Sequence, residues 1–135
     1  MTKIVLIIGD DRMGRIAMTS VHKAFPDIRI YRNRSTSPKR IVKLILKGVL
    51  PLSALLVMAW AEMRRRPVPE PDCPVLVTNQ DVRSMIETEK PDRVICFRAG
   101  LVLTRKTLAL PARFLNLHYT DLPQWGGLGT VYKAL

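Results

Sequence analysis

Short runs rich in apolar residues recur along the chain and alternate with longer stretches in which apolar residues follow a helical period. The first run, residues 4–8, is wholly apolar and β-branched except at Leu6, which is typical of a strand buried on both faces of a sheet. Turn-forming residues bound the later runs, as they usually bound strands. The strands predicted in this way are residues 4–8, 28–31, 75–77, 93–97 and 114–118.

The stretches between these runs predict helices. Residues 13–24 carry an approximate apolar stripe at helical spacing. Thr78 or Asn79 can cap a later helix, on whose inner face Val82 and Ile86 fall. Strands that alternate with helices imply a parallel sheet, so the sequence predicts an α/β fold of three layers, with flanking helices on a mostly parallel sheet. The predicted helices are residues 13–24, 39–50, 52–63, 79–89 and 104–110.

Residues 39–66 form a basic and apolar segment that interrupts the alternation. Residues 48–61 contain no charged side chain, but this stretch is shorter than the roughly 20 residues that span a bilayer, and Pro51 interrupts it. One interpretation is a pair of helices packed on the domain or on a partner. Peripheral contact with a membrane surface is a second, and a true membrane span is a third.

Basic residues are concentrated in the first half of the chain. The formal net charge is +11, and residues 1–66 carry 14 Lys and Arg against 4 Asp and Glu, whereas residues 67–135 carry 8 against 7. Such a concentration of positive charge attracts phosphates, nucleic acid or an anionic membrane surface. The alternative is that the charge serves only solubility or is balanced by acidic residues elsewhere.

The two cysteines, Cys73 and Cys96, lack the spacing of metal ligands and do not suggest a disulfide framework. The apolar run at residues 4–8 is too short for a signal peptide. We therefore expect no metal site and a cytoplasmic, reducing location.

The strand at residues 114–118 carries the clearest candidate chemistry. Because residues two apart share a face of a strand, Asn116 and His118 are expected to point to the same side. They stand at the carboxyl end of the strand, where open α/β sheets bind ligands. An amide donor beside a group that moves protons suits a carbonyl carbon that passes through an oxyanion.

A second candidate is the turn after the first strand. Gly9 and Gly14 frame a strand-to-helix turn whose backbone N–H groups could face an anion. The alternative is simply a tight turn, since neither a Walker loop nor GxGxxG is present.

Asn116-Leu117-His118, followed by Leu122-Pro123 and Gly126-Gly127, resembles the Asn-x-His…Leu-Pro…Gly signature of the folate-dependent formyltransferases. This family includes the methionyl-tRNA, glycinamide ribonucleotide and sugar-amine formyltransferases. Upstream, residues 99–103 and Leu110-Pro111 resemble the family's Gly-Leu-Ile-Leu loop and following proline. Downstream, residues 130–135 resemble the start of the helix after the loop.

The resemblance implies that residues 1–135 are the amino-terminal part of a catalytic domain with a Rossmann-like fold, truncated after the Asn-x-His strand. It implies transfer of a formyl group from 10-formyltetrahydrofolate to a primary amine, a reaction of one-carbon metabolism. Asn116 would donate a hydrogen bond to the formyl oxyanion, and His118 would stabilise that charge when protonated or help to move a proton. Thr120 is a third catalytic candidate. The cofactor-binding candidates are Arg98, Ala99, Gly100, Leu101 and Val102, and the substrate-binding candidates are Gly9, Arg32, Arg34 and Gly126.

The sequence departs from the family in several places. Arg98 stands where the family has an uncharged residue, and Tyr119 replaces a small residue or proline. The family's third catalytic residue, an Asp in a later Asp-x-Gly segment, does not occur before Leu135. We therefore expect this polypeptide alone to be weakly active or inactive, and to self-associate through an unpaired sheet edge.

Several functions compete for this sequence. The favoured one is N-formylation of a nucleotide-linked amino sugar, whose phosphates would match the basic first half. The second is the same chemistry on an aminoacyl-tRNA. The third is a formyltransferase-like module without catalysis that binds an anionic partner or membrane. A generic dinucleotide-binding half-domain is disfavoured, because GxGxxG is absent and Arg32 stands where an acidic residue would be expected.

Overall fold

The computed structural model describes residues 2–34, 42, 45–48 and 51–118. The chain divides into two compact units, the first made of residues 1–35 with 71–135 and the second of residues 36–70. Most of the predicted helix at residues 39–50, together with Thr120 and Gly126, lies outside the described residues.

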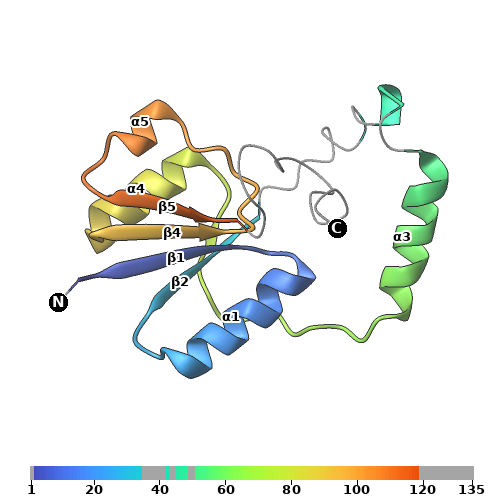
Figure 1. Ribbon diagram of the computed structural model, residues 1–135, viewed down its shortest axis with the longest axis horizontal. Coiled ribbons are helices and arrows are strands. Elements are labelled where there is room, and N and C mark those ends of the chain that lie inside the picture. Colours follow the sequence, from blue (N-terminus) through green and yellow to red (C-terminus); the bar gives the residue numbers. More distant parts are fainter. Residues whose placement is uncertain (1, 35–41, 43–44, 49–50, 119–135) are drawn as a thin grey trace. The chain divides into compact units, whose positions relative to one another are not determined.

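The first unit is built on a parallel sheet, as the sequence predicts (Figure 1). Every strand pairs with its neighbours in parallel, in the order β3-β2-β1-β4-β5. The Rossmann-like α/β fold class is therefore confirmed for the part of the chain that is described. The strands are β1 (Ile4–Gly9), β2 (Arg29–Asn33), β3 (Val75–Leu76), β4 (Arg93–Phe97) and β5 (Arg113–Leu117).

Helices cover both faces of the sheet (Figure 1). On one face α1 (Arg12–Ala24) brings Met18 against Ile8 and Ile30. On the other face α4 (Asn79–Glu89) packs Val82, Met85 and Ile86 against Val5, Ile7 and Val94, and the short α5 (Arg105–Leu108) lies beside α4. The core is thus two apolar layers separated by the sheet.

Strand β2 continues two residues beyond the predicted end at Tyr31. Its last two residues, Arg32 and Asn33, pair with Val75 and Leu76 of β3. Backbone pairing therefore extends the strand through polar residues that its hydrophobic pattern does not include.

Side-chain caps fix where the two longer helices of this unit begin. The Asp11 carboxylate accepts from the Gly14 N–H at 2.7 Å, so α1 starts at Arg12. Thr78 forms a capping box with Asp81 at the start of α4, which decides between the two predicted caps. The helix predicted at residues 104–110 is shorter than expected and ends at Leu108, in keeping with the restriction that Pro111 places on the residue before it.

The second unit contains α3 (Leu52–Arg64), which lies within one residue of the helix predicted at 52–63. Within the described ranges, no helix is long and apolar enough to cross a membrane.

Replacement of a central core residue should weaken the sheet far more than the same replacement on a helix surface. Ile7 is 2% exposed, and an Ile7→Ala change is expected to lower the free energy of unfolding by about 2–5 kcal/mol. The matched control is Ile16→Ala in α1, where the side chain is 43% exposed and the expected change is within about 0.5 kcal/mol. Urea unfolding followed by circular dichroism measures both, and equal losses would contradict the assigned core.

Candidate functional site

A hollow of about 290 Å³ opens at the carboxyl ends of β4 and β5. Arg98, Ala99, Asn116, Leu117 and His118 line it. The register of the two strands explains why these residues lie together. Cys96 pairs with Asn116 and Phe97 pairs with Leu117, and Arg98 and His118 directly follow the ends of β4 and β5. The structure therefore brings Asn116 and His118 together with two of the predicted cofactor-binding residues. Asn116 and His118 are both exposed to solvent.

Gly9 allows the exit of β4 to pass close over the end of β1. A Cβ atom on Gly9 would lie 2.2 Å from the Arg98 carbonyl oxygen, a separation that no side chain permits. At this crossing Arg98 adopts the left-handed region, with φ of 54°. Gly9 thus has a structural role that is independent of the substrate contact predicted for it, which stays a prediction.

The Arg98 side chain pairs with the cap of α1. Its Nε lies 2.9 Å and its Nη2 lies 2.6 Å from Asp11 Oδ2. Asp11 is also the residue that caps the helix through the Gly14 N–H. The departure from the family at position 98 therefore forms an ion pair that ties the loop after β4 to the start of α1.

Two asparagines hold the loop of residues 98–104. The Leu101 N–H donates to Asn33 Oδ1 at 3.1 Å, and Asn33 Nδ2 donates to the Leu76 carbonyl at 3.1 Å. Asn79 Nδ2 donates to the Val102 carbonyl at 3.0 Å, and its Oδ1 accepts from the Thr104 N–H at 2.9 Å. The predicted cofactor loop is therefore fixed at two successive residues by side chains from β2 and α4.

The sequence reasoning missed the roles of Asn33 and Asn79. The only local signal for Asn33 was its place after an apolar strand, at the edge where ligands bind. For Asn79 the sequence predicts only a possible helix cap, and the cap is Thr78.

The side chains of Leu101 and Val102 differ in exposure. Leu101 and Ala99 pack against the core cluster between the sheet and α4. Val102 is 80% exposed. Both residues are predicted to bind the cofactor, and Val102 is the one whose side chain is largely open to solvent.

A cluster of arginines surrounds Asp10 at the carboxyl ends of β1 and β2. Arg15 Nε and Arg34 Nη2 each lie 2.9 Å from Asp10 carboxylate oxygens, and Arg32 Nη1 lies 3.9 Å away. Burial raises the pKa of the Asp10 carboxyl, but hydrogen bonds from Arg34 and Arg15 and the charge of Arg32 outweigh it, so that its pKa lies below the ordinary value. Arg32 and Arg34 are predicted substrate-binding residues, whereas the sequence does not single out Arg15.

The arginine cluster and the hollow share one edge of the sheet. In parallel strands the carboxyl ends lie at the same edge, and β1, β2, β4 and β5 are all parallel. Asp10 and Asp11 are consecutive residues, one paired with the cluster and the other with Arg98. The pair of aspartates thus links the two parts of the candidate site.

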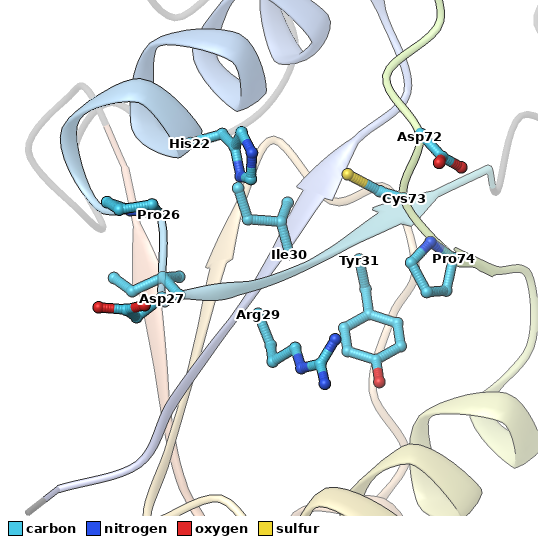
Figure 2. A pocket seen from close by; sticks show the side chains of 10 residues that line it. His22, Pro26, Asp27, Arg29, Ile30, Tyr31, Asp72, Cys73 and Pro74 are labelled. Carbon is cyan, nitrogen blue, oxygen red and sulfur yellow. The ribbon is translucent and has the colours of Figure 1, made fainter.

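A second hollow, of about 360 Å³, lies at the start of β2 beside the end of α1 and the residues before β3 (Figure 2). Cys73 lines it, and burial raises the pKa of the Cys73 thiol, which disfavours a reactive thiolate. None of the predicted site residues lines this second hollow. Across the described part of the chain, no group of three His, Cys, Asp or Glu residues could hold a metal ion.

The parallel sheet defines a Rossmann-like α/β domain, and the polar residues gathered at its carboxyl edge form a candidate ligand site. The chain is related to the formyltransferase family, as its Asn-x-His motif predicts. It is 31% identical over 85 residues to the methionyl-tRNA formyltransferase of Nitrosomonas eutropha, an alignment that covers 62% of this chain and 26% of that protein.

Further similarity is found to two other methionyl-tRNA formyltransferases. The protein of Nitrosomonas europaea is 32% identical over 63 residues, which cover 46% of this chain and 19% of the relative. The protein of Bordetella avium is 44% identical over 46 residues, which cover 33% and 15%. The chain thus spans no more than about a quarter of the length of these relatives. No family model matches the chain. No solved structure matches it.

Loss of the Asn33 side chain should loosen the loop of residues 98–104. In an Asn33→Ala variant the Leu101 N–H loses its acceptor, whereas the Leu76 carbonyl keeps the bond from the Arg34 N–H. One buried group without a partner is expected to lower the free energy of unfolding by about 1–3 kcal/mol. Hydrogen exchange of the Leu101 amide should quicken by more than the global loss explains. The exposed Thr88→Ala change is the control, and unaltered exchange at Leu101 would contradict the assigned bond.

Acid should remove the stabilisation that Asp10 provides. Because its folded pKa lies below the ordinary value of about 3.9, the unfolded chain binds more protons near pH 4, and stability falls as the pH drops through the folded pKa. At pH 7 an Asp10→Asn variant should unfold more easily, by at most the roughly 3–5 kcal/mol of a broken buried pair. This difference in thermal stability should shrink between about pH 5 and pH 3. The exposed Asp27→Asn change is the control, and a difference that does not depend on pH would contradict the ion pairs.

Proposed function

We propose that the carboxyl edge of this sheet is part of the formyl-transfer site of a folate-dependent formyltransferase that acts in the cytoplasm. The donor in this proposal is 10-formyltetrahydrofolate, and the acceptor is a primary amine on an anionic molecule. The observation that carries the proposal is the meeting of Asn116 and His118 with the residue 98–99 loop around one hollow, in a chain related to formyltransferases. Residues 1–135 would form the amino-terminal part of the catalytic domain.

The chemistry assigns a role to each of these side chains. The neutral amine attacks the formyl carbon, a C–N bond forms, and negative charge develops on the formyl oxygen. Asn116 donates a hydrogen bond to that oxygen, and a protonated His118 stabilises the same charge. The bond to the folate nitrogen then breaks, and the proton lost by the amine passes to that nitrogen, with His118 able to carry it. Thr120 is proposed as a third catalytic residue.

The loop of residues 98–102 forms the proposed folate pocket. Val102 is open to solvent and covers the pterin ring in this proposal, while Leu101 supports the loop from the core side. The Asn33 bond to the Leu101 N–H and the Arg98 bond to Asp11 hold the loop in place before the donor arrives. Such preorganisation reduces the ordering that binding would otherwise require.

The arginines around Asp10 support an anionic acceptor. Arg15, Arg32 and Arg34 gather around the Asp10 carboxylate at this edge of the sheet, and arginine is the side chain that binds phosphate most readily. The relatives named above are methionyl-tRNA formyltransferases, so an aminoacyl-tRNA is the first acceptor to test. A nucleotide-linked amino sugar, which the sequence favours, presents the same phosphate chemistry and is the second. Gly9 and Gly126 complete the proposed acceptor side.

Binding of a stable 10-formyltetrahydrofolate analogue tests the donor site. Calorimetric titration should show an affinity that falls about tenfold or more in an Asn116→Ala, His118→Ala double variant, because two hydrogen bonds of about 0.5–1.5 kcal/mol each are lost. A Lys106→Gln variant, changed at an exposed residue of α5, should bind as the unaltered protein does. Equal affinity of the double variant would contradict the proposed site.

Activity assays then distinguish the acceptors. Formyl transfer to methionyl-tRNA and to a nucleotide-linked amino sugar is compared, and Asn116→Ala should lower the rate on the true acceptor by about 10²–10³. Arg34→Gln should raise the KM for that acceptor without a matching change in kcat. Donor binding with no transfer to either acceptor would favour the module without catalysis.

A further inference from the structure

Helix α3 presents a stripe of large apolar side chains to solvent. Leu52, Leu56, Trp60 and Met63 follow one another at intervals of four, four and three residues, the spacing of one helical face. Each of them is more than half exposed. Val57 is exposed beside this stripe, whereas the exposed Met58 lies on the opposite face of the helix. Contiguous apolar surface of this kind marks a site of interaction with a protein or a membrane.

In the sequence, basic residues flank this apolar surface on both sides. Residues 39–66 contain seven Lys and Arg and one acidic residue, Glu62. Arg64, Arg65 and Arg66 follow the stripe directly, and Lys47 precedes it. Arg65 Nη1 lies 3.3 Å from the Glu62 carboxylate, so the one acid of the segment is itself paired. The segment therefore carries a net positive charge, which favours an anionic partner.

The end of the helix combines an aromatic ring with a cation. The guanidinium carbon of Arg64 lies 3.7 Å from the centre of the Trp60 ring. Trp rings are enriched at the headgroup level of membranes, where an arginine can keep its charge in water while its stem covers apolar surface. This pair marks the margin between the apolar stripe and the basic run that follows it.

We infer that α3, together with Lys47 and residues 64–66, forms an anchor that lies in the surface of an anionic lipid bilayer. The helix has 13 residues and is about 20 Å long, which is too short for the roughly 30 Å hydrocarbon core, so it lies in the plane of the interface. Apolar side chains enter the boundary between headgroups and acyl chains, and the arginines contact lipid phosphates. A second copy of this chain is disfavoured as the occupant, because the same excess of positive charge would be brought face to face.

Vesicle binding of the protein tests this inference. In a Trp125→Phe background, Trp60 is the only tryptophan, so its emission reports on α3. With vesicles of phosphatidylcholine containing 30% phosphatidylglycerol as the probe, we expect co-sedimentation and a blue shift of the Trp60 emission. Neither should occur with phosphatidylcholine alone, and added salt should weaken the binding.

Two variants separate the apolar and the electrostatic contributions. Replacement of Arg64, Arg65 and Arg66 by Gln should lower the vesicle affinity by roughly a hundredfold, at about fivefold for each charge. The matched control replaces three exposed basic residues of the first unit, Lys23, Arg105 and Lys106, by Gln and should have a much smaller effect. Leu56→Gln keeps helix propensity and should reduce the blue shift.

Three outcomes would overturn the inference. The first is a folded protein that does not bind anionic vesicles at low salt. The second is binding without a blue shift that Leu56→Gln leaves unchanged, because the first unit would then be adsorbing by charge alone. The third is a concentration-dependent dimer that Leu56→Gln abolishes in a protein that ignores vesicles, because a second copy would then cover α3.

Discussion

The carboxyl edge of the sheet depends on the buried carboxamide of Asn33, which is 3% exposed. The side-chain nitrogen donates to the Leu76 carbonyl, and the side-chain oxygen accepts from the Leu101 N–H. The backbone carbonyl of Asn33 accepts from the Asp10 N–H. Each of these groups would be costly to bury without a partner. One residue therefore holds the end of β3 and the segments after β1 and β4 in a single mutual arrangement.

The strands and helices of the first unit could be predicted because each follows from a short local pattern. Asn116 in β5 and His118, the residue after its end, line the same hollow, as the two-residue period predicts, although the strand is one residue shorter than predicted there. The contacts that organise this edge could not be predicted in the same way. Asn33 and Leu101 are 68 residues apart, and Asp11 and Arg98 are 87 residues apart. A local sequence pattern around one residue therefore cannot predict its partner.

The basic residues of the first half of the chain fall into two groups in the structure. Arg15, Arg32 and Arg34 are drawn to the carboxylate of Asp10 at the sheet edge. The residues around α3 belong instead to the second unit, where Arg65 pairs with the exposed Glu62. A count of charges along the sequence treats both groups alike. Only the structure shows that the first group surrounds a buried carboxylate.

The short strand β3, Val75–Leu76, brings the chain back beside β2, and this pairing affects how much the intervening segment can change. The chain leaves the sheet after β2 and returns at β3, where the Arg34 N–H donates to the Leu76 carbonyl at 3.0 Å. The pairing of β2 with β3 therefore holds the two ends of the intervening segment close together. Since the entropy of closing a loop grows only slowly with its length, residues 36–70 can be lengthened, shortened or exchanged in evolution while the sheet and its edge keep their geometry.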